Sequence, residues 1–208
     1  MNIHNFLIFA FASLMLNITP GNDMLYVASR SVGQGSKAGI ISAVGITAGC
    51  LVHLFGAVIG LSAIIAQSAI AFNVIKYLGA AYLVFLGLKA IISKRNSFNI
   101  GSKFEVAGYK KIFVPGAVTN ILNPKVALFF LAFLPQFIDV SKSHPQLQIL
   151  LLGSWFNFSG TIVNIVVALL FGKLGVWSTK SLFVKWQQKI TGTILIALGI
   201  KVAITSRN

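Results

Sequence analysis

The sequence predicts an all-α integral membrane protein with six transmembrane helices, arranged as two inverted three-helix repeats. Hydrophobic residues make up 56% of the 208 positions and charged residues only 10%, well below the roughly 25% charged residues of soluble domains. Two long stretches, 38–75 and 146–172, contain no Asp, Glu, Lys or Arg. Since a bilayer crossing needs about 20 mostly apolar residues, each stretch is long enough to span a membrane.

Six apolar segments follow one another along the chain. We expect transmembrane helices at residues 5–29, 38–66, 71–92, 112–137, 147–172 and 184–205. The first segment has no Lys or Arg before Arg30 and continues into a polar, proline-containing stretch, so we expect a retained helix and not a signal peptide. One transmembrane domain then divides into a first repeat (1–93), a cytoplasmic linker (94–111) and a second repeat (112–208).

The charge balance is strongly cationic, with 17 Lys and Arg against three Asp and Glu and a formal net charge of +14. These cations lie between apolar segments, so we expect contact with membrane lipid and no nucleic-acid partner. The loops after the first, third and fifth segments share one side and carry 12 cations, whereas the other side carries 4. The positive-inside rule therefore places both termini in the periplasm.

The two halves carry related motifs at matching places. Thr19-Pro20 lies near the middle of the first predicted helix, and Asn123-Pro124 lies near the middle of the fourth. A Gly-x-Lys motif closes the third segment at 87–89 and the sixth at 199–201. Because each half has an odd number of spans, the second must enter the membrane inverted, which is a known plan of transporters.

Both X-Pro pairs are expected to break their helices. Proline removes an intrahelical hydrogen bond and clashes with the preceding turn, and Thr-Pro or Asn-Pro is typical of an N-cap and a first helical residue. In hydrocarbon the freed carbonyls need other partners, so such breaks line a cavity or a buried interface. A restarted helix would direct its positive end into that space and favour an anionic group. The alternative is a simple packing kink.

Asp23 and Lys125 each follow one of the breaks, inside a predicted span. An ionisable group at that depth costs at least about 2.5–3.5 kcal/mol and is typical of a transport pathway or a buried pair. Asp23 is the one carboxylate inside a predicted span, so we predict that it carries protons. We also expect the two side chains to lie together near the midplane and to satisfy each other when no substrate is bound. A static ion pair that ties the halves together is the alternative.

Polar and small residues in other spans give weaker candidates. The second segment places Gly45, Gly49, His53, Gly56 and Gly60 on one stripe, which favours close helix approach. His53 either titrates or forms a packing hydrogen bond. The fifth segment places Asn157, Thr161 and Asn164 on one face, where they either line a polar path or bond a neighbouring helix. The single cysteine, Cys50, is expected to be a packing residue.

No motif indicates an enzyme, a cofactor or a metal site. The sequence lacks a Cys/His cluster with ligand spacing, a phosphate-binding Gly-rich loop with Lys, a nucleophile elbow and a kinase signature. A thiol-redox enzyme would need two intramembrane cysteines, and a scaffold would need no charge in mid-span. Any transport would therefore use an ion gradient or run downhill.

Two blocks of the sequence resemble the lysine exporter / homoserine–threonine exporter family of bacterial amino-acid efflux proteins. The first block begins Thr19-Pro20-Gly21-Asn22-Asp23. The second runs Thr-Asn-Ile-Leu-Asn-Pro-Lys over 119–125 and continues to Leu-Pro-Gln-Phe at 134–137. Asn22 departs from the family, which usually has a second proline there.

The resemblance implies export of amino acids or close derivatives (homoserine-, threonine- or leucine-like, or basic) across the bacterial cytoplasmic membrane by proton antiport. An inorganic-ion exporter of the same superfamily is the alternative, and a homo-oligomer is left open. Together with the breaks, the resemblance gives a candidate substrate and ion site. Its residues are Thr19, Pro20, Gly21, Asn22, Asp23, Asn120, Asn123, Pro124 and Lys125, with His53, Asn157 and Asn164 as weaker candidates.

Overall fold

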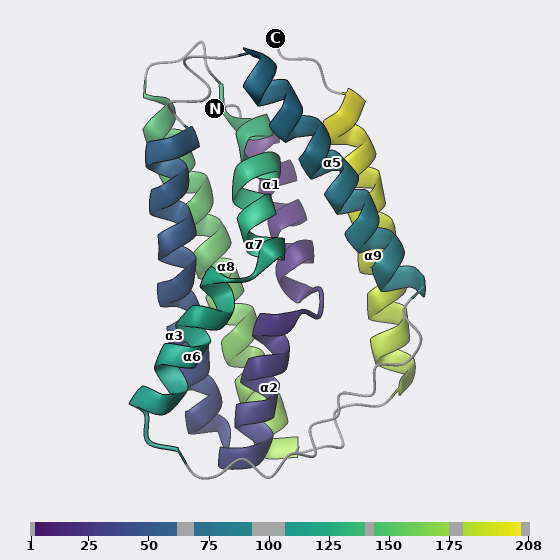
Figure 1. Ribbon diagram of the computed structural model, residues 1–208. Helices are drawn as coiled ribbons and strands as arrows, with labels where there is room; N and C mark the ends of the chain where they lie inside the picture. The colour runs from purple at the N-terminus through teal and green to yellow at the C-terminus, as the bar shows by residue number, and fades with distance from the viewer. Residues whose placement is uncertain (1–2, 62–68, 93–106, 140–143, 175–180, 205–208) are drawn as a thin grey trace.

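The computed structural model of the protein describes residues 3–61, 69–92, 107–139, 144–174 and 181–204. Every regular element in this part of the chain is helical, as the sequence predicts. The helices run along one another as a bundle, and α1 begins at the same end of the bundle at which α9 ends (Figure 1).

The helices follow the predicted apolar segments closely. The first half contains α1 (Ile3–Ile18), α2 (Asn22–Gln34), α3 (Ser36–Gly56), the π-helical turn η1 (Ala57–Leu61) and α5 (Ala69–Ile92). The second half contains α6 (Lys110–Ile121), α7 (Pro124–Leu128), the π-helical turn η2 (Phe129–Phe133), the 3₁₀ turn η3 (Leu134–Phe137), α8 (Pro145–Leu174) and α9 (Ser181–Ile204). The helix α6 begins two residues before the predicted span at 112–137, and residues 94–106 of the predicted linker lie outside the described residues.

Length and composition identify up to four candidate membrane spans in the described part of the chain. Two are single helices, Ser36–Gly60 and Pro145–Lys173, and two are bent pairs, α1 with α2 and α6 with the helical segment Pro124–Phe137. The helices α5 and α9 are each 24 residues long, or about 36 Å at the rise of an α-helix, which exceeds the roughly 30 Å of a bilayer core. The six-span inverted repeat stays a prediction.

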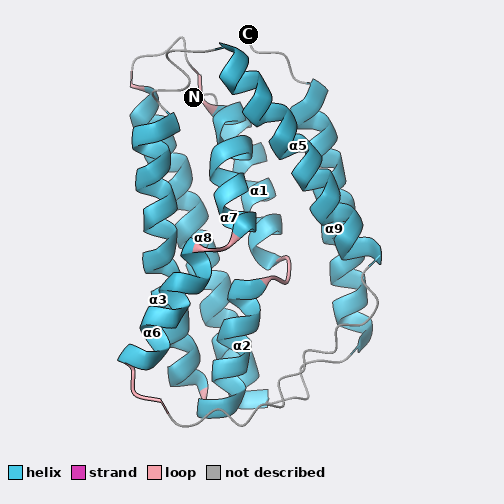
Figure 2. Cartoon of the chain, in the orientation of Figure 1, coloured by secondary structure: helices cyan, strands magenta, loops and turns pink. Residues whose placement is uncertain are grey.

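Both predicted breaks are present, at about mid-height of the bundle (Figure 2). The chain bends by 49° between α1 and α2 and by 45° between α6 and the segment that follows it. At the second break Asn123 is the N-cap and Pro124 the first helical residue, as predicted. The same prediction is wrong for Thr19-Pro20, because α2 begins at Asn22 with Gly21 as its N-cap. Pro20 therefore lies in the connection and not in the first turn.

Two hydrophobic clusters form the interior. The larger one contains stacked aromatic rings, with Phe129 and Phe156 centroids 4.0 Å apart. The smaller one joins α2, α3 and α8 through residues such as Val27, Ala43 and Ala168. The outer faces are apolar too, since Ile59 is 77% exposed and Leu151 is 63% exposed. Helices that are hydrophobic on every face are typical of a membrane environment.

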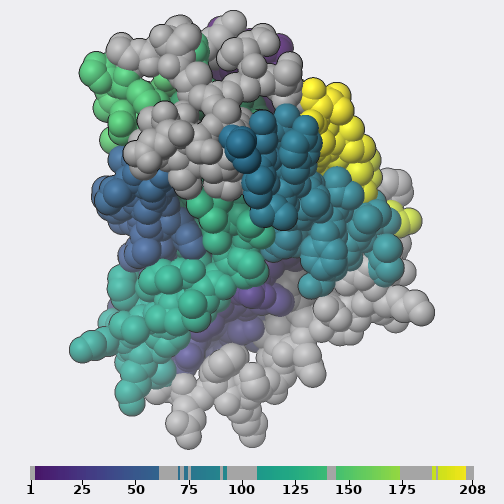
Figure 3. Space-filling view, turned by 45° about the horizontal axis from the view of Figure 1, so that its top comes forward, coloured from purple at the N-terminus to yellow at the C-terminus, as the bar shows by residue number. Residues whose placement is uncertain are grey.

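The α6-to-η3 segment connects the rest of the bundle to the α5–α9 pair. It lies between α3 and α5 on the face seen in Figure 3, and it contacts both, α3 through α6 and α5 through η2. The helices α5 and α9 pack along each other at one edge of the bundle.

The glycine stripe of the second segment produces close packing at only two of its four glycines. An added Cβ at Gly45 would clash with the backbone oxygen of Phe113, and one at Gly49 with that of Ala117. Both oxygens belong to α6, so α3 and α6 approach backbone to backbone there. Among the described residues, a Cβ at Gly56 or Gly60 would meet nothing within 4 Å. The predicted close approach is therefore confirmed at the first two positions and wrong at the last two.

We predict that Gly45→Ala destabilises the protein and that Gly56→Ala does not. Overpacking of a tight contact costs about 1–3 kcal/mol, whereas alanine in an open helical position is favoured over glycine by about 1 kcal/mol. Thermal unfolding of the purified protein in detergent should show a lower midpoint for the first variant only. Equal midpoints for the two variants would contradict the close contact between α3 and α6.

Candidate functional site

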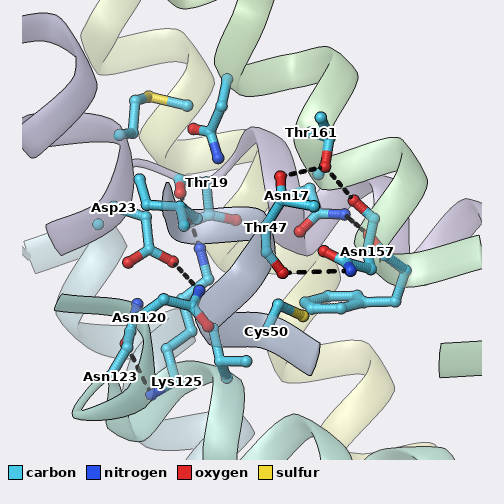
Figure 4. A pocket seen from close by; sticks show the side chains of 17 residues that line it. Asn17, Thr19, Asp23, Thr47, Cys50, Asn120, Asn123, Lys125, Asn157 and Thr161 are labelled. Atoms are coloured by element: carbon cyan, nitrogen blue, oxygen red, sulfur yellow. Dashed lines mark hydrogen bonds between the residues drawn. The ribbon is translucent and has the colours of Figure 1, made fainter. Parts of the chain in front are cut away.

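A small polar cavity lies between the two helix breaks. Its volume is about 40 Å³, which corresponds to about three water-sized spheres. Residues of both halves and of both hydrophobic clusters line it (Figure 4). The lining residues are Asn17, Thr19, Gly21, Asp23, Met24, Ile46, Thr47, Cys50, Asn120, Asn123, Lys125, Val126, Phe156, Asn157, Gly160, Thr161 and Asn164.

Hydrogen bonds from side chains of both halves pair the backbone carbonyls around the first break. Thr19 hydrogen-bonds back onto α1, with its hydroxyl donating to the Met15 carbonyl at 2.8 Å. The Thr19 carbonyl follows the end of α1 at Ile18, so no continuing helix supplies a backbone N–H to it. Lys125 Nζ, from α7 in the second half, donates to this carbonyl at 2.9 Å. A cation of the second half thus provides the partner that the break removes in the first.

Side chains also bond the backbone around the second break, and one of these side chains belongs to the first half. The Asn123 side chain accepts the backbone N–H of Lys125 at 3.0 Å, which caps α7. Asn120 lies in the last turn of α6. Its carbonyl accepts the Asn123 N–H at 2.9 Å and lies 3.0 Å from His53 Nε2 of α3. A carbonyl oxygen only accepts, so Nε2 donates. His53 is therefore a hydrogen-bonded packing residue beside the cavity and does not line it.

Asp23 forms the other bond between the halves. It lies in the first turn of α2, where a carboxylate is favoured by the helix dipole. The Asn120 side-chain amide donates to its Oδ2 at 2.8 Å. The second carboxylate oxygen, Oδ1, and the Asn120 oxygen Oδ1 are both buried and have no partner. An unpartnered buried acceptor is unfavourable, so these two atoms mark where a donor would be accommodated.

Asp23 and Lys125 line the same cavity, but the expectation that they satisfy each other is wrong. Their charged atoms form no ion pair within 4.0 Å. Each instead binds a neutral group of the opposite half: Lys125 binds the Thr19 carbonyl, and Asp23 binds the Asn120 amide. The physical reason is the break itself, because a carbonyl freed in a low-dielectric interior needs a donor and Lys125 supplies it.

The opposite wall of the cavity is uncharged (Figure 4). Thr47 of α3 and Thr161 of α8 bring their hydroxyl oxygens within 2.7 Å of each other. The Thr161 hydroxyl also donates to the Asn157 carbonyl at 2.7 Å, and the Asn157 amide reaches the Thr47 carbonyl at 3.4 Å. Asn17 of α1 donates to Ser159 of α8 at 3.0 Å. Of these residues, all but Ser159 line the cavity as well as bonding neighbouring elements. Asn157 therefore bonds a neighbouring helix and lines the cavity, and its place on a transport path stays a prediction.

Not every sequence candidate reaches the cavity. Asn22 and Pro124 are exposed, and neither they nor Pro20 are among its lining residues. Sequence reasoning missed Asn17 and Thr47 and treated Cys50 as packing only, although all three line the cavity. Asn17 could have been found, since it is an amide in an otherwise apolar helix, two residues before the break.

No metal site is apparent in the described residues, where no three His, Cys, Asp or Glu side chains gather closely enough to hold an ion.

Comparison with known proteins places the chain among membrane transporters. The model of a family described as "LysE type translocator" matches residues 14–206. An uncharacterized membrane protein of Bacillus subtilis (strain 168), YrhP, is 34% identical over 212 residues, which cover 98% of this chain and all of that protein. A leucine efflux protein of Salmonella typhimurium (strain LT2) is 31% identical over 150 residues, covering 72% of this chain and 71% of its own length. No solved structure matches.

We predict that Asn123→Ala lowers the stability of the folded protein by removing the N-cap of α7, whereas Asn123→Ser largely preserves it. Alanine removes the side-chain acceptor that caps α7, and loss of an N-cap costs about 0.5–2 kcal/mol. Serine keeps a capping oxygen. Thermal unfolding in detergent should therefore show a lower midpoint for alanine than for serine. If the two variants unfold together, the Asn123 cap does not stabilise the break.

Proposed function

Because the chain belongs to the LysE type translocator family, we propose that it exports amino acids across the bacterial cytoplasmic membrane in exchange for protons. Membership of a translocator family makes the protein a transporter and not an enzyme. Amino acids as the substrate class follow from the similarity to leucine efflux proteins. The observation that carries the proposal is the cavity between the breaks, which combines one carboxylate and one ammonium group.

A zwitterionic amino acid complements these two groups. In the proposed complex its carboxylate binds Lys125 and its ammonium binds Asp23. The carboxylate competes for the Lys125 ammonium, which now donates to the Thr19 carbonyl. The ammonium donates to Asp23 Oδ1, a buried oxygen that has no partner in the empty site. Substrate binding therefore competes with the bond that Lys125 makes across the two halves. Buried charged groups with defined partners are typical of transport pathways.

The cavity of about 40 Å³ is too small for an amino acid, since one water needs roughly 10–15 Å³ on the same measure. Entry of substrate thus requires the helices to move apart. The breaks are the natural places for that motion, because hinges act at element ends where few residues absorb the change in backbone angles. The site opens alternately to the two sides as the halves rock around it.

Asp23 is assigned as the proton carrier. It is the one carboxylate that lines the cavity in the described part of the chain. An ionised Asp23 binds the substrate ammonium on the cytoplasmic side and releases it on the periplasmic side. A protonated Asp23 then returns without substrate, so that one proton enters for each amino acid that leaves.

The proposed topology has six spans and both termini in the periplasm. In Figure 1 the α2–α3 connection and the start of α6 lie at one end of the bundle, while the start of α1, the start of α8 and the end of α9 lie at the other. The first end carries Arg30, Lys37, Lys110 and Lys111, and a cation-rich end faces the cytoplasm.

We predict that cysteines placed at opposite ends label from opposite sides of the membrane. Gly108 and Gln146 are exposed, precede α6 and begin α8 respectively, and would be replaced singly by cysteine in a protein whose Cys50 is alanine. In intact cells an impermeant thiol reagent should modify Gln146→Cys and should modify Gly108→Cys only after the membrane is permeabilised. The reverse pattern would overturn the orientation.

We predict that Asp23→Asn abolishes the response of export to a pH gradient while the protein remains folded in the membrane. Asparagine keeps the shape of the side chain but cannot exchange a proton. Efflux of leucine from proteoliposomes, with and without an imposed gradient, measures the effect, and the variant is expected to give the same efflux in both conditions. Asp139→Asn is the matched control, since Asp139 lies outside the cavity lining. A variant that still follows the gradient would show that Asp23 does not couple.

A further inference from the structure

The charges on the cavity wall set a limit on what the cavity can bind. Among its described lining residues, Asp23 and Lys125 are the only charged ones. The backbone carboxylate and ammonium of an amino acid use both. Any further charge on the substrate would then enter the cavity without a counterion.

Unpartnered atoms show where a ligand must donate. Asp23 Oδ1 and Asn120 Oδ1 are buried acceptors without a partner, on side chains that are hydrogen-bonded to each other. An ammonium group has three donors and no acceptor, so it suits two neighbouring acceptors. Asn120 is placed between the halves, and its backbone oxygen is already bound by His53.

Among the described residues, the opposite wall of the cavity has no fully buried acceptor without a partner. The hydroxyls of Thr47 and Thr161 and the amide of Asn157 bond one another or neighbouring carbonyls. Within the described lining, the only buried side-chain nitrogen or oxygen atoms without a partner are the two acceptors on Asp23 and Asn120. Apolar surface fills the space around this wall, from Met24, Ile46, Cys50 and Phe156.

We infer that the cavity selects amino acids with an uncharged side chain. Asp23 and Asn120 together form the subsite for the substrate ammonium, Lys125 receives the carboxylate, and the wall of Thr47, Cys50, Phe156 and Asn157 receives the side chain. This inference rests on the proposed function and narrows it, because it excludes the basic and acidic amino acids that the family resemblance leaves open.

The physical reason for the selectivity is desolvation. A lysine side chain would bring a second ammonium against a wall that has no second carboxylate, and a glutamate side chain would bring a carboxylate without a second cation. A buried charge needs a partner. A leucine or threonine side chain meets apolar surface and hydroxyl groups whose bonds it need not break.

The test is competition for counterflow in proteoliposomes. Proteoliposomes that contain the wild-type protein would be loaded with unlabelled leucine, and the uptake of external radiolabelled leucine would be measured. Unlabelled leucine, threonine, lysine or glutamate would be added outside as competitors. We expect lysine and glutamate to require at least about 100-fold higher concentrations than leucine for half-inhibition. Inhibition by lysine or glutamate within tenfold of leucine would overturn the inference while leaving the exporter function in place. Failure of every amino acid to exchange would instead contradict the proposed function, and the inference with it.

A designed second carboxylate adds an independent measurement. Asn157→Asp places an anion of similar shape on the uncharged wall, and Asn157→Ser is the matched neutral control. The aspartate variant should improve lysine inhibition relative to leucine by at least tenfold, and the serine variant should leave the ratio within about threefold of wild type. An unchanged ratio in a folded Asn157→Asp protein would show that this wall does not receive the side chain. The wild-type competition series decides the selectivity whether or not the variant folds.

Discussion

The need to pair backbone groups at two broken helices governs the rest of this structure. In hydrocarbon an unpaired carbonyl has no water to bind, and prolines at 20 and 124 prevent the chain from pairing within one continuous helix. The partners come from the opposite half, since Lys125 binds the Thr19 carbonyl and His53 binds that of Asn120. The breaks therefore stabilise each other, and the polar cavity is a consequence of bringing them together.

This mutual pairing explains why charged residues are tolerated in the interior. Lys125 does not need Asp23 as a counterion in direct contact, because its Nζ already donates a hydrogen bond to the Thr19 carbonyl at 2.9 Å. Asp23 in turn has an amide donor and the first turn of α2. The separation of the two charges by neutral partners leaves both accessible from the cavity between them.

Sequence reasoning located the breaks and the two charges because proline and intramembrane charge have few interpretations in an apolar chain. It could not give the partners, since these depend on how the halves pack and not on local pattern. Thr47 was missed because a polar residue in a largely apolar helix does not reveal which neighbour it faces, whereas the position of Asn17 just before the first break was a usable signal. Pro20, Asn22 and Pro124 belong to the motifs but lie outside the cavity lining, so they shape the turns around it. Gly45 and Gly56 likewise belong to one predicted stripe, but of the two only Gly45 lies against another described helix.

The proposed transport follows from the double use of these bonds. Lys125, the group that would receive the substrate carboxylate, also pairs across the halves with the Thr19 carbonyl, so binding weakens a contact between them. Part of the interaction energy then goes into loosening that interface, and a ligand shifts a conformational equilibrium only through such a difference between states. The substrate ammonium meanwhile occupies acceptors of Asp23 and Asn120 that have no partner in the empty site. Under the proposed function, a zwitterion therefore both loosens the bond at the first break and satisfies these acceptors, whereas a ligand with a single charge does only one of the two.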